Sequence, residues 1–293
     1  MRSIEHPGPV HPMRVHCVPA TIRAVDLELP RGVTLLQGLA DAVSAHGATS
    51  AVFSLQEGSL APMAFVMPAL SDSPKHVAYF SERFEAHGEA RIESGSITFG
   101  LCDGEPSLHC HATWIESDGH RRSGHLLASE SRVKTPVRLQ AWMLGGAVFE
   151  VAPDAESNFN LFQASASATR SGGVDALVVQ VRPNQDLCFA LERICAERNI
   201  RRGRIRGGVG SLIGAVFNDG RTVEPFVTEV FIRRGVIETG GDGTPRAEVD
   251  VGLVAHTGEI AEGRLERGQN PVLITFELVI EVQDEAPSAG GHS

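Results

Sequence analysis

The chain contains one stretch twice, and this duplication constrains the fold more than any other feature of the sequence. In the first copy His109-Cys110-His111 is followed by Gly124-His125-Leu126, and in the second Glu248-Val249-Asp250 is followed by Gly263-Arg264-Leu265, at a constant offset of 139 residues. The first copy has three histidines, and the second has none at the matching positions. The chain therefore carries two related units, of which only one keeps a set of potential metal ligands.

A second pair of matched motifs extends the duplication toward the N-terminus. Thr34-Leu35-Leu36 and Gly58-Ser59-Leu60 recur as Asp186-Leu187-Cys188 and Gly210-Ser211-Leu212, at an offset of 152 residues. The two offsets differ by 13, so the first copy carries about that many extra residues, for which residues 68–88 are the natural place. Repeated units of roughly 110 to 135 residues are domain-sized, so we predict a tandem pair of domains and not a solenoid.

The expected domain boundaries follow from these matches and from composition. The first domain is expected to span residues 14–150 and the second residues 175–284. Residues 151–174 are rich in Ala, Ser and Asn and include Ser171-Gly172-Gly173, which is typical of a linker. At 293 residues the chain is long enough to bury two cores without staples.

Each unit is expected to contain one amphipathic helix and several strands. From Thr34 to His46 the apolar residues recur on one helical face, and residues 186–198 repeat the pattern. Thr34 is a suitable N-cap for the first helix, and Gly47 is suited to end it. After each helix come short β-rich runs separated by Gly, Asp and Pro turns.

The composition is that of a soluble globular protein, with 42% hydrophobic and 21% charged residues. No apolar run approaches the ~20 residues that span a bilayer, and residues 1–18 have no apolar signal core, so a cytoplasmic location and no membrane partner are expected. The five cysteines form no CxxC pair, and we expect reduced thiols.

The net charge of −10 argues against nucleic acid as a partner, because duplex DNA binding draws most of its affinity from neutralised phosphates. One basic cluster runs against this trend. Its arginines are Arg193, Arg198, Arg201, Arg202, Arg204 and Arg206. Such a cluster at a helix end is typical of a solvated surface, although an anionic small molecule or another subunit would bind the same guanidinium groups. Nucleic acid binding is therefore the less favoured interpretation.

Strand alternation brings the histidines together if the hairpin turn has three residues. In a strand, His109 and His111 point to one face, about 7 Å apart. Ser117-Asp118-Gly119 suits a three-residue turn closed by glycine, and this turn places His125 opposite His111. A two-residue turn at Asp118-Gly119 would send His125 to the opposite face. The three-residue turn therefore predicts one cluster of imidazoles.

The same register predicts a cross-strand pair in the second copy. With His256-Thr257-Gly258 as the turn, Arg264 lies opposite Asp250, which is a complementary pair of charges. An ion pair is one arrangement that can replace the metal ligands in a copy that no longer binds a metal. It is also a possible contact for an anion or a carboxylate.

Three neutral imidazoles form a competent ligand set for Zn²⁺ or another divalent transition metal, and they leave a fourth position for water or substrate. Such a metal activates water as a nucleophile or polarises a carbonyl group. The alternative is chance pairing of surface histidines, since the chain has 12 of them. Alternation points Cys110 away, so the predicted metal ligands are His109, His111 and His125.

These motifs together resemble the PPC or PCC domain, which is conserved in plants and prokaryotes. The resemblance covers most of both halves and is carried by Arg182-Pro183-Asn184-Gln185-Asp186-Leu187, the two Gly-Ser-Leu elements, His109-x-His111 and Gly124-His125-Leu126. It implies an α+β fold of two tandem PCC-like domains, each a mainly antiparallel sheet with a packed helix, and a trimeric assembly. In some members of the family the three histidines look like metal ligands near a subunit interface.

The chain also departs from the family pattern. The family is mostly single-domain, so a tandem chain suggests a homotrimer with a pseudo-sixfold arrangement of domains. The first unit has Pro30-Arg31-Gly32-Val33-Thr34 in place of the family's helix opening, and the second unit lacks the histidines. The AT-hook core of some plant members, Arg-Gly-Arg-Pro, is absent, because Arg202-Gly203-Arg204-Ile205 has no proline. This difference disfavours DNA binding by this chain.

Two functions of different classes are compatible with the sequence. The favoured one is a metal-dependent enzyme of hydrolase or lyase type that acts on a small anionic metabolite at the three-histidine site. Arg31 and Arg264 are candidates for binding the carboxylate of this metabolite, and Glu89, which aligns with Glu229 of the second copy, is a candidate acid or base. The alternative for Glu89 is simple surface placement. The second function is a non-enzymatic binding or regulatory module, in which the metal holds a trimer together or senses a ligand.

Overall fold

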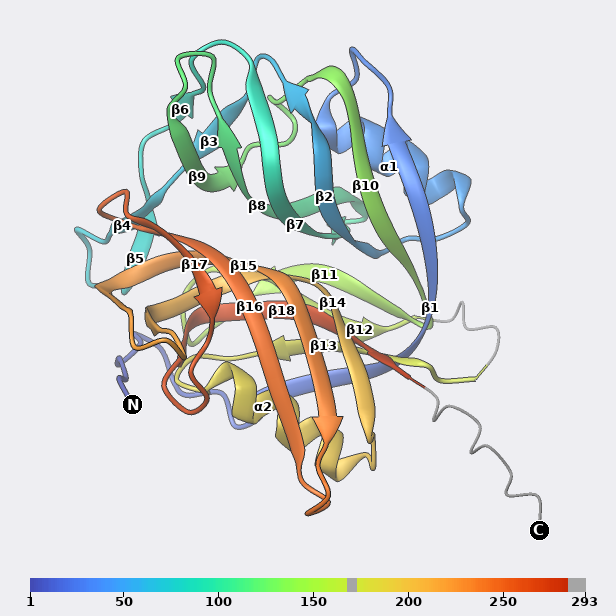
Figure 1. Ribbon diagram of the computed structural model, residues 1–293, viewed down its shortest axis with the longest axis vertical. Helices are drawn as coiled ribbons and strands as arrows, with labels where there is room; N and C mark the ends of the chain where they lie inside the picture. Colours follow the sequence, from blue (N-terminus) through green and yellow to red (C-terminus); the bar gives the residue numbers. More distant parts are fainter. Residues whose placement is uncertain (168–172, 284–293) are drawn as a thin grey trace.

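The structure is a computed structural model that describes residues 1–167 and 173–283, and these residues form two lobes dominated by antiparallel sheet (Figure 1). The first half contains β1 (Val15–Leu29), α1 (Leu35–Ala45), β2 (Ala51–Leu60), β3 (Ala64–Val66), β4 (Pro68–Leu70), β5 (Ala78–Phe80), β6 (Phe84–Glu85), β7 (Ala90–Cys102), β8 (Glu105–Ile115), β9 (Arg121–Leu126), β10 (Val133–Gly145), β11 (Ala147–Pro153) and β12 (Asn160–Ala166). The second half contains β13 (Ala176–Val181), α2 (Leu187–Glu197), β14 (Arg202–Val216), β15 (Thr222–Thr239), β16 (Pro245–Ala255), β17 (Ile260–Arg264) and β18 (Val272–Val282).

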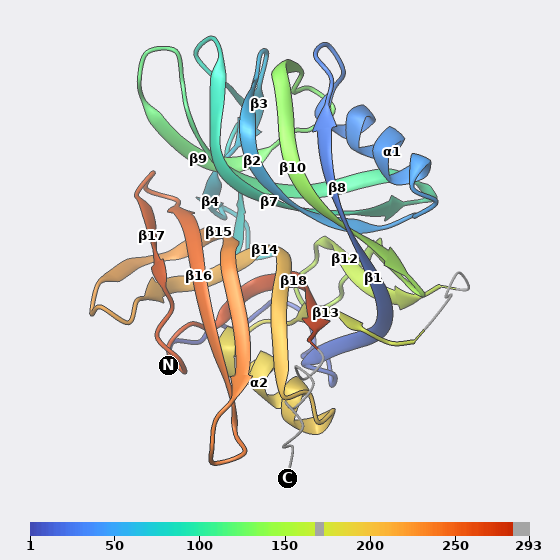
Figure 2. The same ribbon diagram turned by 45° about the vertical axis from the view of Figure 1, so that its right-hand side comes forward.

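The two halves share one continuous sheet because β1 belongs to both of them. Residues 15–20 of β1 pair with β13, and residues 21–29 pair with β10. Figure 2 shows β1 running from one lobe into the other. The order β1-β10-β2-β7-β8-β9 on one side is repeated as β13-β18-β14-β15-β16-β17 on the other. The duplicated sequence therefore corresponds to a duplicated strand order.

Both helices form where the sequence predicts them. The side chain of Thr34 caps α1 by accepting a hydrogen bond from the Gln37 N–H, and Asp186 caps α2 by accepting one from the Phe189 N–H. Gly47 follows α1 with a φ of 68°, a left-handed conformation that glycine adopts without strain. In the described residues these are the two helices of a structure that is otherwise mostly antiparallel sheet.

The repeated Gly-Ser-Leu element lies where one strand crosses close over another. A Cβ atom at Gly58 would lie 2.6 Å from the Pro136 carbonyl oxygen, and one at Gly210 would lie 2.3 Å from the Thr275 carbonyl oxygen. Only glycine allows an approach of this kind. In the second half this approach places the following residue, Ser211, against the junction of the two lobes.

The extra residues of the first copy form a small sheet of their own. β4 pairs with β5 in a separate two-stranded sheet, and β4 contacts β15 of the second half. Figure 1 shows this pair beside the junction of the lobes. The insertion expected at residues 68–88 thus covers the place where the two units meet.

The segment expected to be a linker, residues 151–174, is instead largely part of a β-hairpin. β11 pairs with β12, and the rings of Phe149 and Phe162 lie 6.1 Å apart within a core cluster that draws on both halves. The small residues of this segment indicated a linker, but Phe162 and Ala164 alternate inward and form a buried face. Residues 168–172 lie outside the described part. Because β1 also enters both sheets, the expected boundaries do not coincide with the division of the strands.

Two further expectations concern thiols and membranes. All five cysteines are free, and burial raises the pKa of the Cys110 thiol far above its usual value. No helix in the described residues has the length and apolar character needed to cross a membrane. The cytoplasmic location stays a prediction.

Candidate metal centre

The three histidines meet where β8 runs beside β9. His111 pairs directly with His125, and the turn is closed by a 2.9 Å hydrogen bond from the Gly119 N–H to the Glu116 carbonyl, with Gly119 at a φ of 85°. One potential ligand atom from each of His109, His111 and His125 lies within 4.8 Å of the others. The predicted register is confirmed, and with it the convergence of the three imidazoles.

The second copy follows the same register without the histidines. Asp250 pairs with Arg264, and the Arg264 Nε lies 2.9 Å from the Asp250 Oδ1. Gly258 closes the turn with a φ of 85°. The predicted cross-strand ion pair is confirmed, and it lines a different groove from the histidines.

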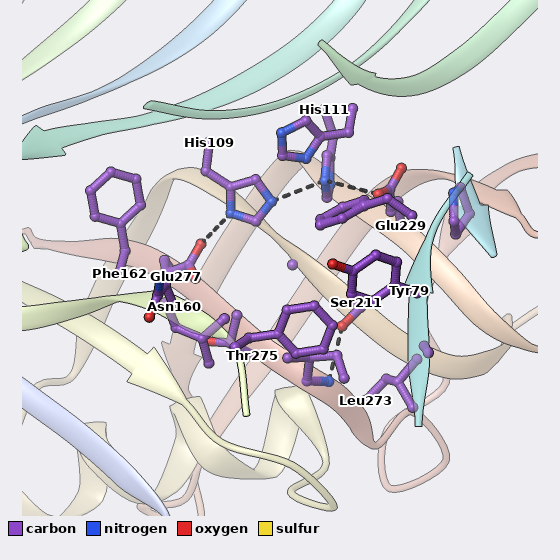
Figure 3. Close-up of a pocket in the computed structure, with 18 of the residues that line it drawn as sticks. Tyr79, His109, His111, Asn160, Phe162, Ser211, Glu229, Leu273, Thr275 and Glu277 are labelled. Atoms are coloured by element: carbon purple, nitrogen blue, oxygen red, sulfur yellow. Dashed lines mark hydrogen bonds and ion pairs between the residues drawn. The ribbon is translucent and has the colours of Figure 1, made fainter. Parts of the chain in front are cut away.

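The second half of the chain supplies the hydrogen-bond partners of the histidines. The His109 Nδ1 lies 2.8 Å from the Glu277 Oε2 (Figure 3). The His111 Nδ1 lies 3.0 Å from the Val230 carbonyl oxygen. These partners stand on β18 and β15. The centre is therefore built by one lobe and oriented by the other.

These contacts determine which ring nitrogens are free. A carbonyl oxygen only accepts, so His111 carries its proton on Nδ1, and in the neutral ring Nε2 keeps a lone pair. His109 donates its Nδ1 proton to the Glu277 carboxyl oxygen, which gives it the same tautomer. The two Nε2 atoms lie 3.0 Å apart, so two lone pairs face each other. A cation between them removes this repulsion, and two nitrogens on a tetrahedral zinc ion lie about 3.3 Å apart.

His125 completes the set with a nitrogen that lacks a partner. Its Nδ1 atom is buried and has no hydrogen bond to the described residues. Burial and, to a smaller extent, the nearby His109 lower the pKa of His125 to about 3. Burial also lowers the pKa of His111 well below its usual value, with contributions from the other two imidazoles. Both rings are therefore unprotonated near neutral pH, as metal ligation requires.

A buried carboxylate lies next to this set. The Glu229 Oε1 is 3.9 Å from the His111 Nε2, and Figure 3 shows the side chain reaching in from β15. The Glu229 Oε2 is buried and has no hydrogen-bond partner in the described chain. Burial raises the pKa of Glu229 well above its usual value.

The histidines open into a cavity of about 370 Å³ between the lobes. Its aromatic lining comes from β5 and from the β11–β12 hairpin: Tyr79, Phe80, Phe159 and Phe162. Its polar lining includes Asn160, Ser211, Thr228, Thr275, Glu229 and Glu277. No lysine or arginine is among the described lining residues.

Three residues predicted to serve the site lie elsewhere. Glu89 accepts a 2.6 Å hydrogen bond from the Ser59 hydroxyl and does not line the cavity. Arg31 is exposed in the loop before α1. Arg264 is occupied by Asp250 on the neighbouring strand. Glu89, Arg31 and Arg264 therefore lie outside this cavity, and the roles expected of them stay predictions.

The error over Glu89 has a structural cause. Arg91 pairs with Ile115 and Glu229 pairs with Val254, and the offset of 139 matches Ile115 to Val254. Glu229 therefore corresponds to Arg91 and not to Glu89. The sequence match had equated Gly95 with Gly235, whereas by strand pairing Gly235 corresponds to Ile97, two residues further along β7. The glutamate beside the histidines is the one in the second copy.

Glu277 and Val230 were missed by sequence reasoning, although Glu277 leaves a signal. It is a charged residue in the middle of the otherwise apolar run of β18, and its side chain is only 1% exposed. A buried charged residue needs a hydrogen-bond or ionic partner that offsets the free-energy cost of its burial. Val230 acts through its backbone carbonyl and leaves no signal.

Replacing Glu277 with alanine is expected to weaken metal binding about 10- to 100-fold, because the His109 ring loses its orienting acceptor. A titration against a chelating dye measures this change. Glu281→Ala removes a carboxylate of the same strand that pairs with Arg206 instead, and it should leave the metal affinity unchanged. Equal affinities of the two variants would show that Glu277 does not support the site.

No family model matches the sequence, and no curated protein matches it. Among solved structures, the chain is similar to a plant- and prokaryote-conserved (PPC) protein from Pyrococcus horikoshii, with a TM-score of 0.40 and 19% identity over 49% of this chain and 94% of that chain. It is also similar to a metal-containing protein from Archaeoglobus fulgidus (TM-score 0.40, 20% identity, 48% of this chain and 93% of that chain). A Salmonella enterica protein gives a TM-score of 0.41 at 20% identity, over 52% of this chain and 99% of that chain. The likeness to PPC domain proteins expected from the sequence is thus found, and each match spans about half of this chain.

Proposed function

We propose that the protein is a metal-dependent enzyme of hydrolase or lyase type that acts on a small molecule in the junction cavity. The proposal rests above all on the two Nε2 atoms of His109 and His111, which face each other at 3.0 Å while both Nδ1 atoms are held by acceptors. The buried, unpartnered Nδ1 of His125 supports it. Zinc or another divalent transition metal suits three imidazoles, and when bound it supplies Lewis acidity toward a carbonyl group or a water molecule.

The surrounding residues have separate tasks in this proposal. Glu229 is close enough to the histidines to take a proton from a nucleophile and to return it to a leaving group. Glu277 holds the His109 ring in the required tautomer. The Ser211 hydroxyl already accepts a 3.0 Å hydrogen bond from the Ile274 N–H, so its own proton is free for a bound molecule.

The expected anionic character of the ligand receives no support from the cavity. The candidate arginines lie elsewhere, and the charged side chains among the described lining residues other than histidine are the carboxyl groups of Glu229 and Glu277. A carboxylate ligand would have the metal as its one positive partner. The proposed substrate is therefore a small molecule without a required negative charge.

The metal is tested by elemental analysis of the purified protein, which should hold about one zinc or similar ion per chain. His111→Ala removes a central ligand and should abolish stoichiometric binding. His87→Ala, at a histidine whose side chain is 73% exposed outside the cluster, should leave the metal in place. If the unaltered protein carries no metal and takes up none from added zinc, the proposal fails.

A second candidate is a non-enzymatic module in which the metal clamps the two lobes. It is favoured by the contacts that His109 and His111 make with the second half. In that case chelation should lower the melting temperature strongly, and Glu229→Gln should have no effect beyond stability. The expected homotrimer stays a prediction, which sedimentation of His111→Ala can test together with the clamp.

A further inference from the structure

The cavity beside the histidines is lined by two buried carboxyl groups and by no cation among the described residues. Glu229 and Glu277 are both buried and face the same space from β15 and β18 (Figure 3). The described lining contains no guanidinium or ammonium group to offset them. An anion entering this space would find no cationic partner among these residues, so the lining disfavours a negatively charged ligand.

The mouth of the cavity presents aromatic rings to solvent. Tyr79 is 52% exposed and Phe80 is 42% exposed, although both are large and apolar. Tyr79 lies nearly parallel to Phe159 at 5.9 Å, and Phe80 meets the His125 ring edge-on at 5.3 Å. A flat ring that covers aromatic surfaces of this kind is bound favourably, because stacking and burial lower the free energy of the complex. The rings come from the insertion of the first copy and from the hairpin between the halves, so the second copy has no counterpart.

Two carboxyl oxygens on the floor of the cavity lack hydrogen-bond partners among the described residues. The Glu229 Oε2 and the Glu277 Oε1 are buried and have no hydrogen-bond partner in the described residues. A buried acceptor that stays unpaired is costly, and a ligand N–H directed at it removes that cost. The floor therefore favours a ligand that donates hydrogen bonds.

We propose that this cavity binds uncharged planar ring compounds that carry N–H donors, that is, aromatic or cyclic amides. This ligand class is the substrate class of the enzyme proposed above and rests on that function. The rings at the mouth receive the flat part of the ligand, and the carboxyl groups at the floor receive its N–H groups. The ligand carbonyl then lies toward the histidines.

Benzamide and benzoate test this class, because they share a ring and differ in charge and in N–H donors. The full chain is stripped of metal with a chelator, so that a carboxylate cannot gain from coordination, and binding is followed by calorimetry or saturation-transfer NMR. Benzamide should bind saturably and at least about tenfold more tightly than benzoate.

Variants locate the binding. Tyr79→Ala and Phe159→Ala should each weaken benzamide binding about tenfold. Phe189→Ala is a matched control, because Phe189 is 49% exposed on α2 and does not line the cavity. The inference is overturned if benzoate binds as well as benzamide, if benzamide does not saturate, or if the cavity variants behave like the control.

These outcomes are separable from those of the metal test. If the protein holds zinc but binds benzoate more tightly than benzamide after the metal is removed, the proposed enzyme class stands and the proposed ligand class is wrong. If the protein binds benzamide more tightly than benzoate but takes up no metal, the proposed ligand class stands and the proposed metal-dependent reaction is wrong.

Discussion

Replacing Arg182 with methionine is expected to lower the free energy of unfolding by about 3–5 kcal/mol, as measured by urea denaturation at neutral pH. Arg182 and Asp154 form a buried ion pair, with side chains 5% and 3% exposed. Removing the cation leaves a carboxylate in the interior with one remaining side-chain partner, Ser157. The loss is large because water cannot replace the missing guanidinium.

Two further variants separate this effect from a general loss of arginine. Arg138→Met breaks pairs with Glu28 and Glu57 on an exposed side chain, and it should change the stability by less than about 1 kcal/mol. Adding Asp154→Leu to Arg182→Met should restore much of the loss, since no charge is then buried alone. A loss below about 1 kcal/mol for Arg182→Met itself would show that the pair does not stabilise the fold.

The ion pair of Arg182 and Asp154 makes the stability lost in Arg182→Met depend on pH. Burial acts to raise the pKa of Asp154, but hydrogen bonds from Arg182 and Ser157 outweigh it and hold the pKa below its usual value. A depressed folded-state pKa stabilises the fold above the unfolded value of about 3.9, and this stabilisation disappears as the pH falls through the folded pKa. In Arg182→Met, burial dominates and raises the pKa, so the variant gains stability as the pH falls from 7. The difference in the free energy of unfolding between the unaltered protein and Arg182→Met should therefore become smaller as the pH falls from 7 to 4.

The sequence predicted local geometry well because local geometry follows from short-range rules. The register that joins His111 to His125 depends on one glycine turn and on strand alternation, and both are encoded within a few residues. The caps Thr34 and Asp186 are predicted for the same reason. The PPC-like pattern added the antiparallel sheet, which these local signals do not contain.

The remaining parts of the site depend on how the halves meet. Glu229 and Glu277 lie more than 100 residues from the histidines in the chain, and no periodicity relates them. The hairpin of β11 and β12 was missed because its small residues resemble a linker, and its buried face exists only against the two lobes. Glu89 was matched to Glu229 by a glycine spacing that the strand pairing does not follow, and neither Arg31 nor Arg264 lines the cavity. Long-range packing, which single-sequence patterns do not specify, therefore decides the ligand as well as the acid or base.

Glu229→Gln is expected to reduce turnover about 10²- to 10⁴-fold while the protein keeps its metal, because glutamine has the shape of glutamate but does not transfer a proton. Release of 4-nitroaniline from 4-nitroacetanilide measures the reaction. In this reaction water supplies the hydroxyl group that ends on the carbonyl carbon and the proton that ends on the leaving nitrogen. Glu229 lies 3.9 Å from the His111 Nε2, within reach of both transfers.

The control for this variant is Glu89→Gln, at the glutamate that the sequence offered as a candidate acid or base. Glu89 bonds to Ser59 away from the cavity, so its variant should keep turnover within about twofold of the unaltered protein. Metal content and melting temperature, measured for both variants, exclude loss of the site or of the fold as the cause. If Glu229→Gln retains metal and full turnover, the carboxyl group does not carry the proton. Its burial beside three imidazoles would then serve to balance the charge of the metal, which supports the clamp in place of the enzyme.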